Sequence, residues 1–383
     1  MSKERVLHVC LASVAMLGFG LFILACTGWM SWSPDGSQMV FGYWDPNVEQ
    51  FRIALYRMGS ARARALNPKE FSEGDTWLSA QWKRDGSALF VFRNSKDENS
   101  NPVISVMEVS VPNGEVLRQV NVPAKSDSTV PIPPVEVQNA LFIVLETGIT
   151  RIDLATLELK KSDETGEAYI YSLDADRVYY VRQDTDDNNL ELGYVDPQTM
   201  AFNHMFKITM NDPRFREGEL KGLPAADPKG TRFAFASTRK DRDDIAVLNQ
   251  AGVERIFTPK FPFKKFHIGN MKWSPDGKHL YAGVINPVRA DVEKYSVADI
   301  DVDSGEATLF PIAEIHANSD FRDSFGLWVQ VELSPDGRTI ATSTANLKKE
   351  LISDKDRALY LIDIGGKGDV RSVPAPVLKK RKK

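Results

Sequence analysis

Three oxygen-bearing residues in the middle of the chain have the spacing of a calcium-binding loop. Asp184, Asp186 and Asn188 occupy alternate positions, as the first ligands of an EF-hand loop do. Asn189 stands where such a loop needs glycine, and Val195 stands where it needs a bidentate glutamate. We therefore predict no metal site of this type and no bound cofactor, and leave open only a loosely held cation.

The histidines give little support for catalysis. Outside the N-terminal segment the sequence contains His204, His267, His279 and His316. His279 directly follows a glycine-containing turn and His204 falls in an expected outer strand, so we interpret both as structural. The sequence has no Gly-x-Ser-x-Gly elbow, no P-loop and no dinucleotide fingerprint. These patterns favour a binding protein over an enzyme.

The elements that must position these residues are repeated along the chain. The motif Trp32–Gly36 (Trp-Ser-Pro-Asp-Gly) recurs at Trp273–Gly277 and Leu333–Gly337, with degenerate copies at Trp82–Gly86 and Ala226–Gly230. Proline presets φ in such a turn and glycine supplies the residue with positive φ, so each copy predicts a tight turn between strands. We assign this structural role to Pro34, Asp35, Gly36, Asp85, Gly86, Pro275, Asp276, Gly277, Pro335, Asp336 and Gly337.

A second series of turns sets the size of the repeating unit. Apolar runs end in polar turns at residues 59–60, 112–114, 251–252, 303–305 and 365–366, and two weaker units lie near residues 138–154 and 173–196. Both series occur seven times, with a spacing of about 50 residues, enough for four strands and their turns. We predict an all-β chain that forms a seven-bladed β-propeller of four-stranded antiparallel blades, with six or eight blades less favoured.

These motifs resemble a known repeat. The Trp-Ser-Pro-Asp-Gly turns, with Phe235–Asp241 and Asp244–Asn249, resemble the TolB-type, WD40-like β-propeller repeat over residues 27–375. The resemblance implies the propeller fold but leaves the function open, since propellers include binding modules and enzymes. TolB itself resembles a six-bladed propeller with an extra α/β domain, for which this sequence has no room.

The phase of the repeat predicts how the ring closes. The first inner strand is expected at residues 28–32 and the last outer strand near residues 369–374. No N-terminal strand is then left to complete the seventh blade. We expect the ring to close by packing of the last blade against the first, without a shared blade.

The loops between these strands carry the candidate binding residues. Segments such as Arg239–Asp244 and Phe261–His267 mix charged side chains with aromatic ones. This composition suits the recognition of a protein or peptide. The candidate binding residues are Arg216, Phe263, Lys264, His267, His316 and Arg322.

A row of aspartates on one expected strand has a simpler interpretation than a metal site. Asp299, Asp301 and Asp303 alternate onto one face, as metal ligands could. Asp301, however, has the place in its unit that other units fill with Asp153, Asp196 and Asp363. We therefore predict that these side chains cap turns.

The N-terminal segment predicts export. Lys3 and Arg5 precede an apolar run from Val6 to Cys26, the pattern of a secretory leader or a membrane-anchor helix. The run ends in Ile-Leu-Ala-Cys, which resembles a bacterial lipobox with Cys26 as the lipidated residue. An uncleaved signal anchor and ordinary cleavage are the alternatives. Both cysteines of the chain lie in this segment, so the body can hold no disulfide.

Charge and length complete the domain assignment. The net charge of −4 gives no general case for nucleic-acid binding, and 42% hydrophobic residues argue for a folded chain. A basic tail follows the last repeat. We assign residues 1–26 to the leader or anchor, 27–375 to the propeller and 376–383 to the tail.

Together, these features predict a membrane-anchored, extracytoplasmic protein of the cell envelope, monomeric, acting as a non-catalytic binding module for a protein or envelope partner. One alternative is a propeller enzyme, a hydrolase or lyase acting on a saccharide or peptide at the channel mouth, with carboxylates such as Asp320 and Asp323 as acid and base. A second alternative is a structural spacer.

Overall fold

The computed structural model describes residues 30–45, 47, 50–66, 77–111, 113–124, 134–145, 148–162, 168–171, 177–184, 189–209, 219–239, 242–317, 330–345, 347 and 351–376. The predicted leader, Cys26 and the basic tail beyond residue 376 lie outside these ranges. Within the residues that the structure describes, no helix is both long enough and apolar enough to cross a membrane.

The described chain is built from short β-strands. Blades 1 to 3 contain β1 (Met30–Trp32), β2 (Gln38–Asp45), β3 (Gln50–Arg57), β4 (Arg64–Leu66); β5 (Trp77–Trp82), β6 (Ala88–Lys96), β7 (Pro102–Ser110), β8 (Val116–Pro123); β9 (Val135–Val137), β10 (Ala140–Leu145), β11 (Gly148–Asp153), β12 (Leu159–Lys161). Blades 4 and 5 contain β13 (Ala168–Tyr171), β14 (Val178–Asp184), β15 (Asn189–Val195), β16 (Phe202–Thr209); β17 (Glu219–Ala226), β18 (Arg232–Arg239), β19 (Arg242–Asn249), β20 (Gly252–Phe257). Blades 6 and 7 contain β21 (His267–Trp273), β22 (His279–Arg289), β23 (Val292–Asp301), β24 (Ala307–His316); β25 (Val331–Leu333), β26 (Thr339–Ser343), the 3₁₀ turn η3 (Asp354–Asp356), β27 (Ala358–Asp363), β28 (Val370–Pro374).

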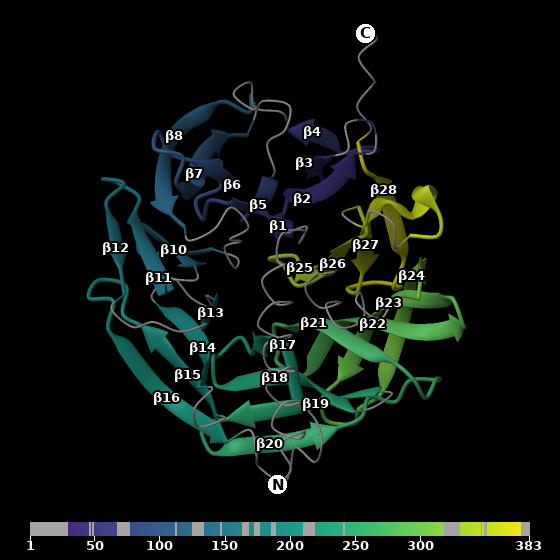
Figure 1. Cartoon of the computed structure of the whole chain (residues 1–383). Coiled ribbons are helices and arrows are strands. Elements are labelled where there is room, and N and C mark those ends of the chain that lie inside the picture. The colour runs from purple at the N-terminus through teal and green to yellow at the C-terminus, as the bar shows by residue number, and fades with distance from the viewer. Residues whose placement is uncertain are drawn as a thin grey trace, which may run out of the picture.

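Seven four-stranded antiparallel sheets are arranged around an axis, each made of four consecutive strands (Figure 1). The predicted all-β, seven-bladed propeller is confirmed. Blade 7 takes all of its strands from the C-terminal part of the described chain and lies beside blade 1. The predicted closure without a shared blade therefore agrees with the strand order.

The hydrophobic core lies between the blades. Seven clusters of buried side chains each join two neighbouring blades, and one of them joins blade 7 to blade 1. The middle strands are covered on both faces, so β10 is buried at every residue. The outer strand β8 instead alternates between partly buried and exposed residues. This difference explains why the middle strands read as continuous apolar runs.

The Ser-Pro-Asp-Gly turns repeat one hydrogen-bond pattern. In the first, the hydroxyl of Ser33 donates to Asp35 Oδ1 at 2.6 Å and accepts the N–H of Gln38 at 2.9 Å. The N–H of Gly36 donates to the Ser33 carbonyl at 2.8 Å. The turns at Ser274 and Ser334 have the same bonds. The structural role predicted for these residues is thus a local one.

Neighbouring turns also touch one another around the ring. Gly337 has φ of +70°, and a Cβ there would lie 2.6 Å from Pro275 of the preceding blade. Pro335 of the same turn lies against Gly36 across the closing seam. The turns form a chain of contacts on one end of the propeller, and glycine is needed at Gly337 for both backbone and packing reasons.

We call the contact between two neighbouring blades a seam. At five of the seven seams, an Arg or Lys on the outer strand of one blade donates a hydrogen bond to a backbone carbonyl group of the next blade. Arg255 of β20 donates to the carbonyls of Val302 and Asp303 at 2.7 and 2.6 Å, in the turn between β23 and β24. In four further blades, the residue at the same position of the outer strand makes the same kind of contact. These five residues are called the seam clamps: Arg64, Arg118, Lys160, Arg255 and Arg371. Asn203 and Thr308 hold the position in blades 4 and 6.

One aspartate of the row in blade 6, Asp301, caps a turn as predicted. Asp301 Oδ1 accepts the N–H of Ser304 at 2.6 Å and caps the turn after β23. Asp153 and Asp196 cap the corresponding turns of blades 3 and 4 in the same way. The hydrogen bonds from these N–H groups lower the pKa of each of the three carboxyls.

Replacing Gly337 tests the contact between turns. We expect Gly337→Ala to lower the free energy of unfolding by about 2–4 kcal/mol, because alanine resists positive φ and its methyl group meets Pro275. Gly59→Ala is the matched control, since φ is +80° there but nothing lies within 4 Å. It should cost about 1–2 kcal/mol. Urea unfolding measures both, and equal losses would contradict the packing contribution.

The turns also predict a loss of stability in acid. Hydrogen bonds from Ser33 and Ser37 lower the pKa of Asp35 from its ordinary value of 3.8 to about 2, and the pKa values of Asp276 and Asp336 are lowered in the same way. The unfolded chain therefore binds more protons, so the stabilisation is full above about pH 4 and declines towards pH 2. We expect a variant with Ser33, Ser274 and Ser334 changed to Ala to lose less stability over this range in urea titrations. Parallel pH curves for the two proteins would contradict this.

Candidate functional site

The segment Thr258–His267 links blade 5 to blade 6 and is called the blade 5–6 connector below. Three phenylalanine rings gather in it. Phe261 stacks on Phe263 with ring centroids 5.4 Å apart and meets the edge of Phe266 at 4.7 Å. Phe266 is buried, whereas Phe261 and Phe263 are only partly covered and pack against the core cluster of this seam. Lys264 beside them is exposed. The connector thus presents aromatic surface next to positive charge.

Both blades hold the start of the connector in place. The hydroxyl of Thr258 donates to Asp244 Oδ1 at 2.5 Å, which ties the connector to blade 5. The N–H of Lys260 donates to the Gly305 carbonyl at 2.8 Å, and its ammonium pairs with Glu306 at 2.7 Å. Proline at 259 and at 262 further restricts the backbone. The aromatic rings therefore lie on a chain segment of limited freedom.

The end of the connector is held by a buried carboxylate. Asp243, which is 1% exposed, accepts the N–H of Ile268 at 2.7 Å through Oδ2. Among the described residues, its Oδ1 has no hydrogen-bond donor, and it lies 3.4 Å from Nδ1 of His267, whose side chain is 22% exposed. A hydrogen on Nδ1 of His267 would point towards this oxygen. The buried carboxylate therefore ties the end of the connector to blade 5.

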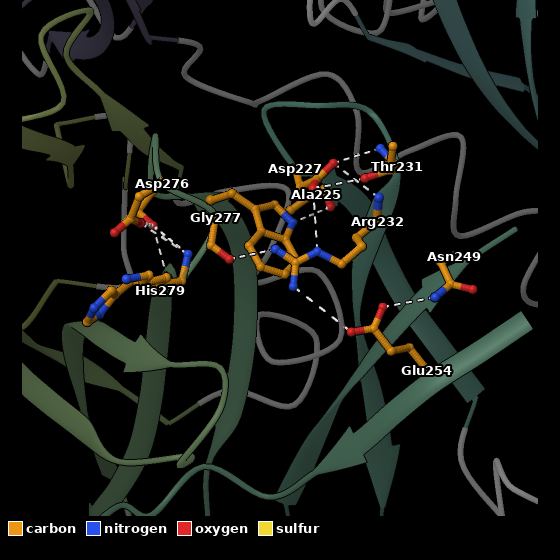
Figure 2. Close-up of polar contacts among 12 residues, drawn as sticks. Ala225, Asp227, Thr231, Arg232, Asn249, Glu254, Asp276, Gly277 and His279 are labelled. Carbon is orange, nitrogen blue, oxygen red and sulfur yellow. Dashed lines mark hydrogen bonds and ion pairs between the residues drawn. The ribbon is translucent and has the colours of Figure 1, made fainter. Parts of the chain in front are cut away.

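The C-terminal end of β21 and the turn after it are also bonded to blade 5. The guanidinium of Arg232 donates to the Gly277 carbonyl at 2.6 Å and lies 4.6 Å over the ring of Trp273 (Figure 2). Trp273 donates through Nε1 to the Ala225 carbonyl at 2.8 Å. Arg232 also pairs with Asp227 at 3.4 Å. Because β21 is anchored at both ends, the connector before it has a fixed base.

The structure brings together three of the six candidate binding residues. Phe263, Lys264 and His267 all belong to the connector. His316 ends β24, on the opposite edge of the blade 6 sheet from His267 in β21, and the two strands lie about 14 Å apart at the usual strand spacing. The sequence analysis grouped His267 and His316 in one candidate site, and the structure places them in the same blade but at opposite edges of its sheet. Arg216 and Arg322 lie outside the described residues.

Sequence reasoning missed the buried half of this site. Asp243 was included only as one charge in a charge-dense loop, and Phe261 and Phe266 only as part of an aromatic run. The pair Asp243-Asp244 at the start of an otherwise apolar strand was the available signal, since strand interiors seldom carry carboxylates without partners.

Among the described residues, no group of three or more His, Cys, Asp or Glu side chains is placed to hold a metal ion. Asp184 ends β14, and the following four residues of the calcium-like spacing lie outside the described ranges. Asp299 accepts a hydrogen bond from His279 at 2.7 Å, when that nitrogen carries the proton.

No family model matches the sequence, and no curated protein matches it. Solved structures do match. Oligogalacturonate lyase from Vibrio parahaemolyticus has a TM-score of 0.52 at 13% identity, covering 92% of this chain and 89% of that one. KlAtg21, solved with the coiled coil of AgAtg16, has a TM-score of 0.51 at 11% identity, covering 92% and 100%. TolB from Acinetobacter baumannii has a TM-score of 0.43 at 12% identity, covering 72% and 64%.

At these identities, the likeness to the lyase and to KlAtg21 is one of fold alone. It agrees with the architecture built from the strands themselves. The described chain is a seven-bladed β-propeller, similar in fold to solved propellers that include an enzyme and a protein in complex with a coiled coil.

Proposed function

We propose that this protein is a recognition module that binds a protein segment at the blade 5–6 connector. The observation that carries the proposal is the set of three phenylalanine rings, partly covered and partly open, on a segment tied to both neighbouring blades. Aromatic side chains contribute most to protein binding where they are already ordered, because little conformational entropy is then lost.

The chemistry of the connector suits a partner with apolar and acidic side chains. Phe261 and Phe263 offer apolar surface, and the exposed ammonium of Lys264 lies beside them. The propeller KlAtg21 is recorded with a coiled coil bound, which supports the idea that this fold can present a surface to a helical partner.

A comparison of two double variants tests the binding surface. Phe263→Ala with Lys264→Ala removes an aromatic ring and a charge from the connector. Leu159→Ala with Lys161→Ala removes an exposed apolar residue and an exposed lysine from blade 3, where we expect no binding. In pull-downs from membranes, we expect the blade 3 variant to retain the partners of the native protein and the connector variant to lose them, a change of tenfold or more in affinity. Equal recovery by both variants would place the binding surface elsewhere.

We further propose that the propeller acts on the outer side of the cytoplasmic membrane, held there by lipidated Cys26 or by an uncleaved N-terminal helix. The support is the basic and apolar composition of residues 1–26 and their lipobox-like end. Metabolic labelling with palmitate should mark the native protein and not Cys26→Ser. Absence of label on a native protein that still fractionates with membranes would exclude the lipoprotein and leave the anchor helix.

A further inference from the structure

A polar centre on blade 4 has no part in the proposed binding surface. Glu191 of β15 is 8% exposed and accepts four hydrogen bonds. Tyr180 donates its hydroxyl to Oε1 at 2.6 Å, and Arg182 donates to both carboxylate oxygens at 3.1 and 3.0 Å. Nδ1 of His204 lies 2.5 Å from Oε1. A buried carboxylate, an arginine, a tyrosine and a histidine thus meet on one face of the sheet.

An irregularity in the sheet aims His204 at this centre. Leu192 pairs with Phe206, but the next residue, Gly193, pairs with His204, so Met205 is an extra residue in β16. Without this bulge, His204 would point to the other face of the blade. Gly193 also leaves room for the ring of Tyr180, because a Cβ there would lie 2.7 Å from the tyrosine oxygen.

The hydrogen bonds define the state of each group. Burial raises the pKa of Glu191, but the bonds from Tyr180 and Arg182 outweigh it, so the pKa of Glu191 lies below its ordinary value. With Glu191 ionised, a nitrogen 2.5 Å from its oxygen must carry the proton, so Nδ1 of His204 is the donor. Nε2 then keeps its lone pair, and 57% of the histidine side chain is exposed.

This centre is not a product of the repeat. Glu191 lies five residues before the turn-capping Asp196, and the residues five before the corresponding turn positions Ser110, Asp153 and Asp301 are Ser105, Gly148 and Ser296. None of these is a carboxylate, but blade 5 has one at this position, since Asp244 lies five residues before Asn249. Asp244 pairs across the sheet with Ser237 and accepts a hydrogen bond from Thr258. The combination of a carboxylate with an arginine, a tyrosine and a histidine is therefore particular to blade 4 among the blades compared.

We propose that His204 is a general base that hydrolyses carboxylic esters, with Glu191, Arg182 and Tyr180 as its positioning residues. This activity is separate from the recognition function above. The exposed imidazole can reach water, which serves as the nucleophile. Hydrolysis of a glycoside would need two carboxylic groups and phosphoryl transfer would need further cations, whereas an ester needs only the single proton shuttle that one imidazole provides.

The step is balanced without another reagent. Nε2 of His204 takes a proton from water as the water oxygen bonds to the ester carbonyl carbon and the carbonyl π pair moves onto the carbonyl oxygen. The carbonyl double bond then re-forms as the bond to the alkoxy group breaks, and the alkoxide takes the proton back from Nε2, giving an acid and an alcohol. While the ring is charged, Nδ1–H stays on Glu191, whose charge Arg182 balances in the resting state.

Four charged or titratable side chains of the described residues can be placed around His204. Glu191 faces it from β15, Tyr180 and Arg182 face it from β14, and Lys207 lies on the same face of its own strand, opposite Glu191. Ionised Glu191 contacts the imidazole and stabilises a positive charge on the ring during the step. Removing the charge of Glu191 should therefore slow the reaction.

The test uses p-nitrophenyl acetate as the ester and the full-length protein. His204→Asn should lower the catalysed rate about 100-fold at pH 7.5. His279→Asn is the matched control, because His279 also pairs with a carboxylate, Asp299, at 2.7 Å, but that pair lacks the arginine and the tyrosine. Its rate should equal that of the native protein. Glu191→Gln should lower the rate, and Glu191→Asp, which keeps the carboxylate, should restore part of it, which a structural role alone would not do.

Three results would overturn the proposal. These are a native rate no higher than that of buffer, an unchanged rate in His204→Asn, or equal losses in His204→Asn and His279→Asn, which would indicate unspecific imidazole chemistry. Circular dichroism of each variant distinguishes loss of the base from loss of the fold. The connector variant should keep the full esterase rate, so failure of this proposal and failure of the binding proposal are distinguishable.

Discussion

The seams between blades are the constraint on which the rest of this structure depends. No two of the seven described sheets share a strand, so side chains must hold the ring together. Each seam has its own core cluster, and five seams add a clamp from an outer-strand Arg or Lys to carbonyl groups of the next blade. A hydrogen bond from a charged group contributes about 1–3 kcal/mol where water is partly excluded. The blade 5–6 connector lies at the seam of blades 5 and 6, and Tyr180 of the blade 4 centre belongs to the core cluster between blades 3 and 4. The positions of the side chains in both candidate sites therefore depend on the packing of these two seams.

The fold was predictable because its signals are local. A Ser-Pro-Asp-Gly turn is specified by five neighbouring residues, and the hydrogen bonds of Ser33, Asp35 and Gly36 involve no other blade. Counting the turns therefore gave the number of blades. The seam clamps also have a local signature in the sequence, which is a basic residue six to eight positions after the last residue of the third strand of a blade. In blade 5, for example, the third strand ends at Asn249 and the clamp is Arg255. That signature was overlooked because Lys and Arg are common on exposed strands.

The sites were less predictable because their partners come from different elements. Asp243 and His267 are distant in sequence and meet only once blade 6 is packed on blade 5. His204 was correctly placed in an outer strand but interpreted as structural, since a bulge that turns it towards Glu191 leaves no mark in the hydrophobic pattern. His267 begins β21 and His316 ends β24 of the same blade, but the order of the strands sets the two residues at opposite edges of the sheet.

Closure without a shared strand has a consequence for how the chain is made. Each blade is one uninterrupted stretch of sequence, so it can complete its β ladders as soon as that stretch has left the ribosome. Six seams can then form in order of synthesis, between a blade and the one just before it. Only the seam that joins blade 7 to blade 1, with Arg371 against Tyr56 and Ser60, must wait until blade 7 has been synthesised. Until that moment the growing protein is an open arc with the apolar flank of its first blade uncovered.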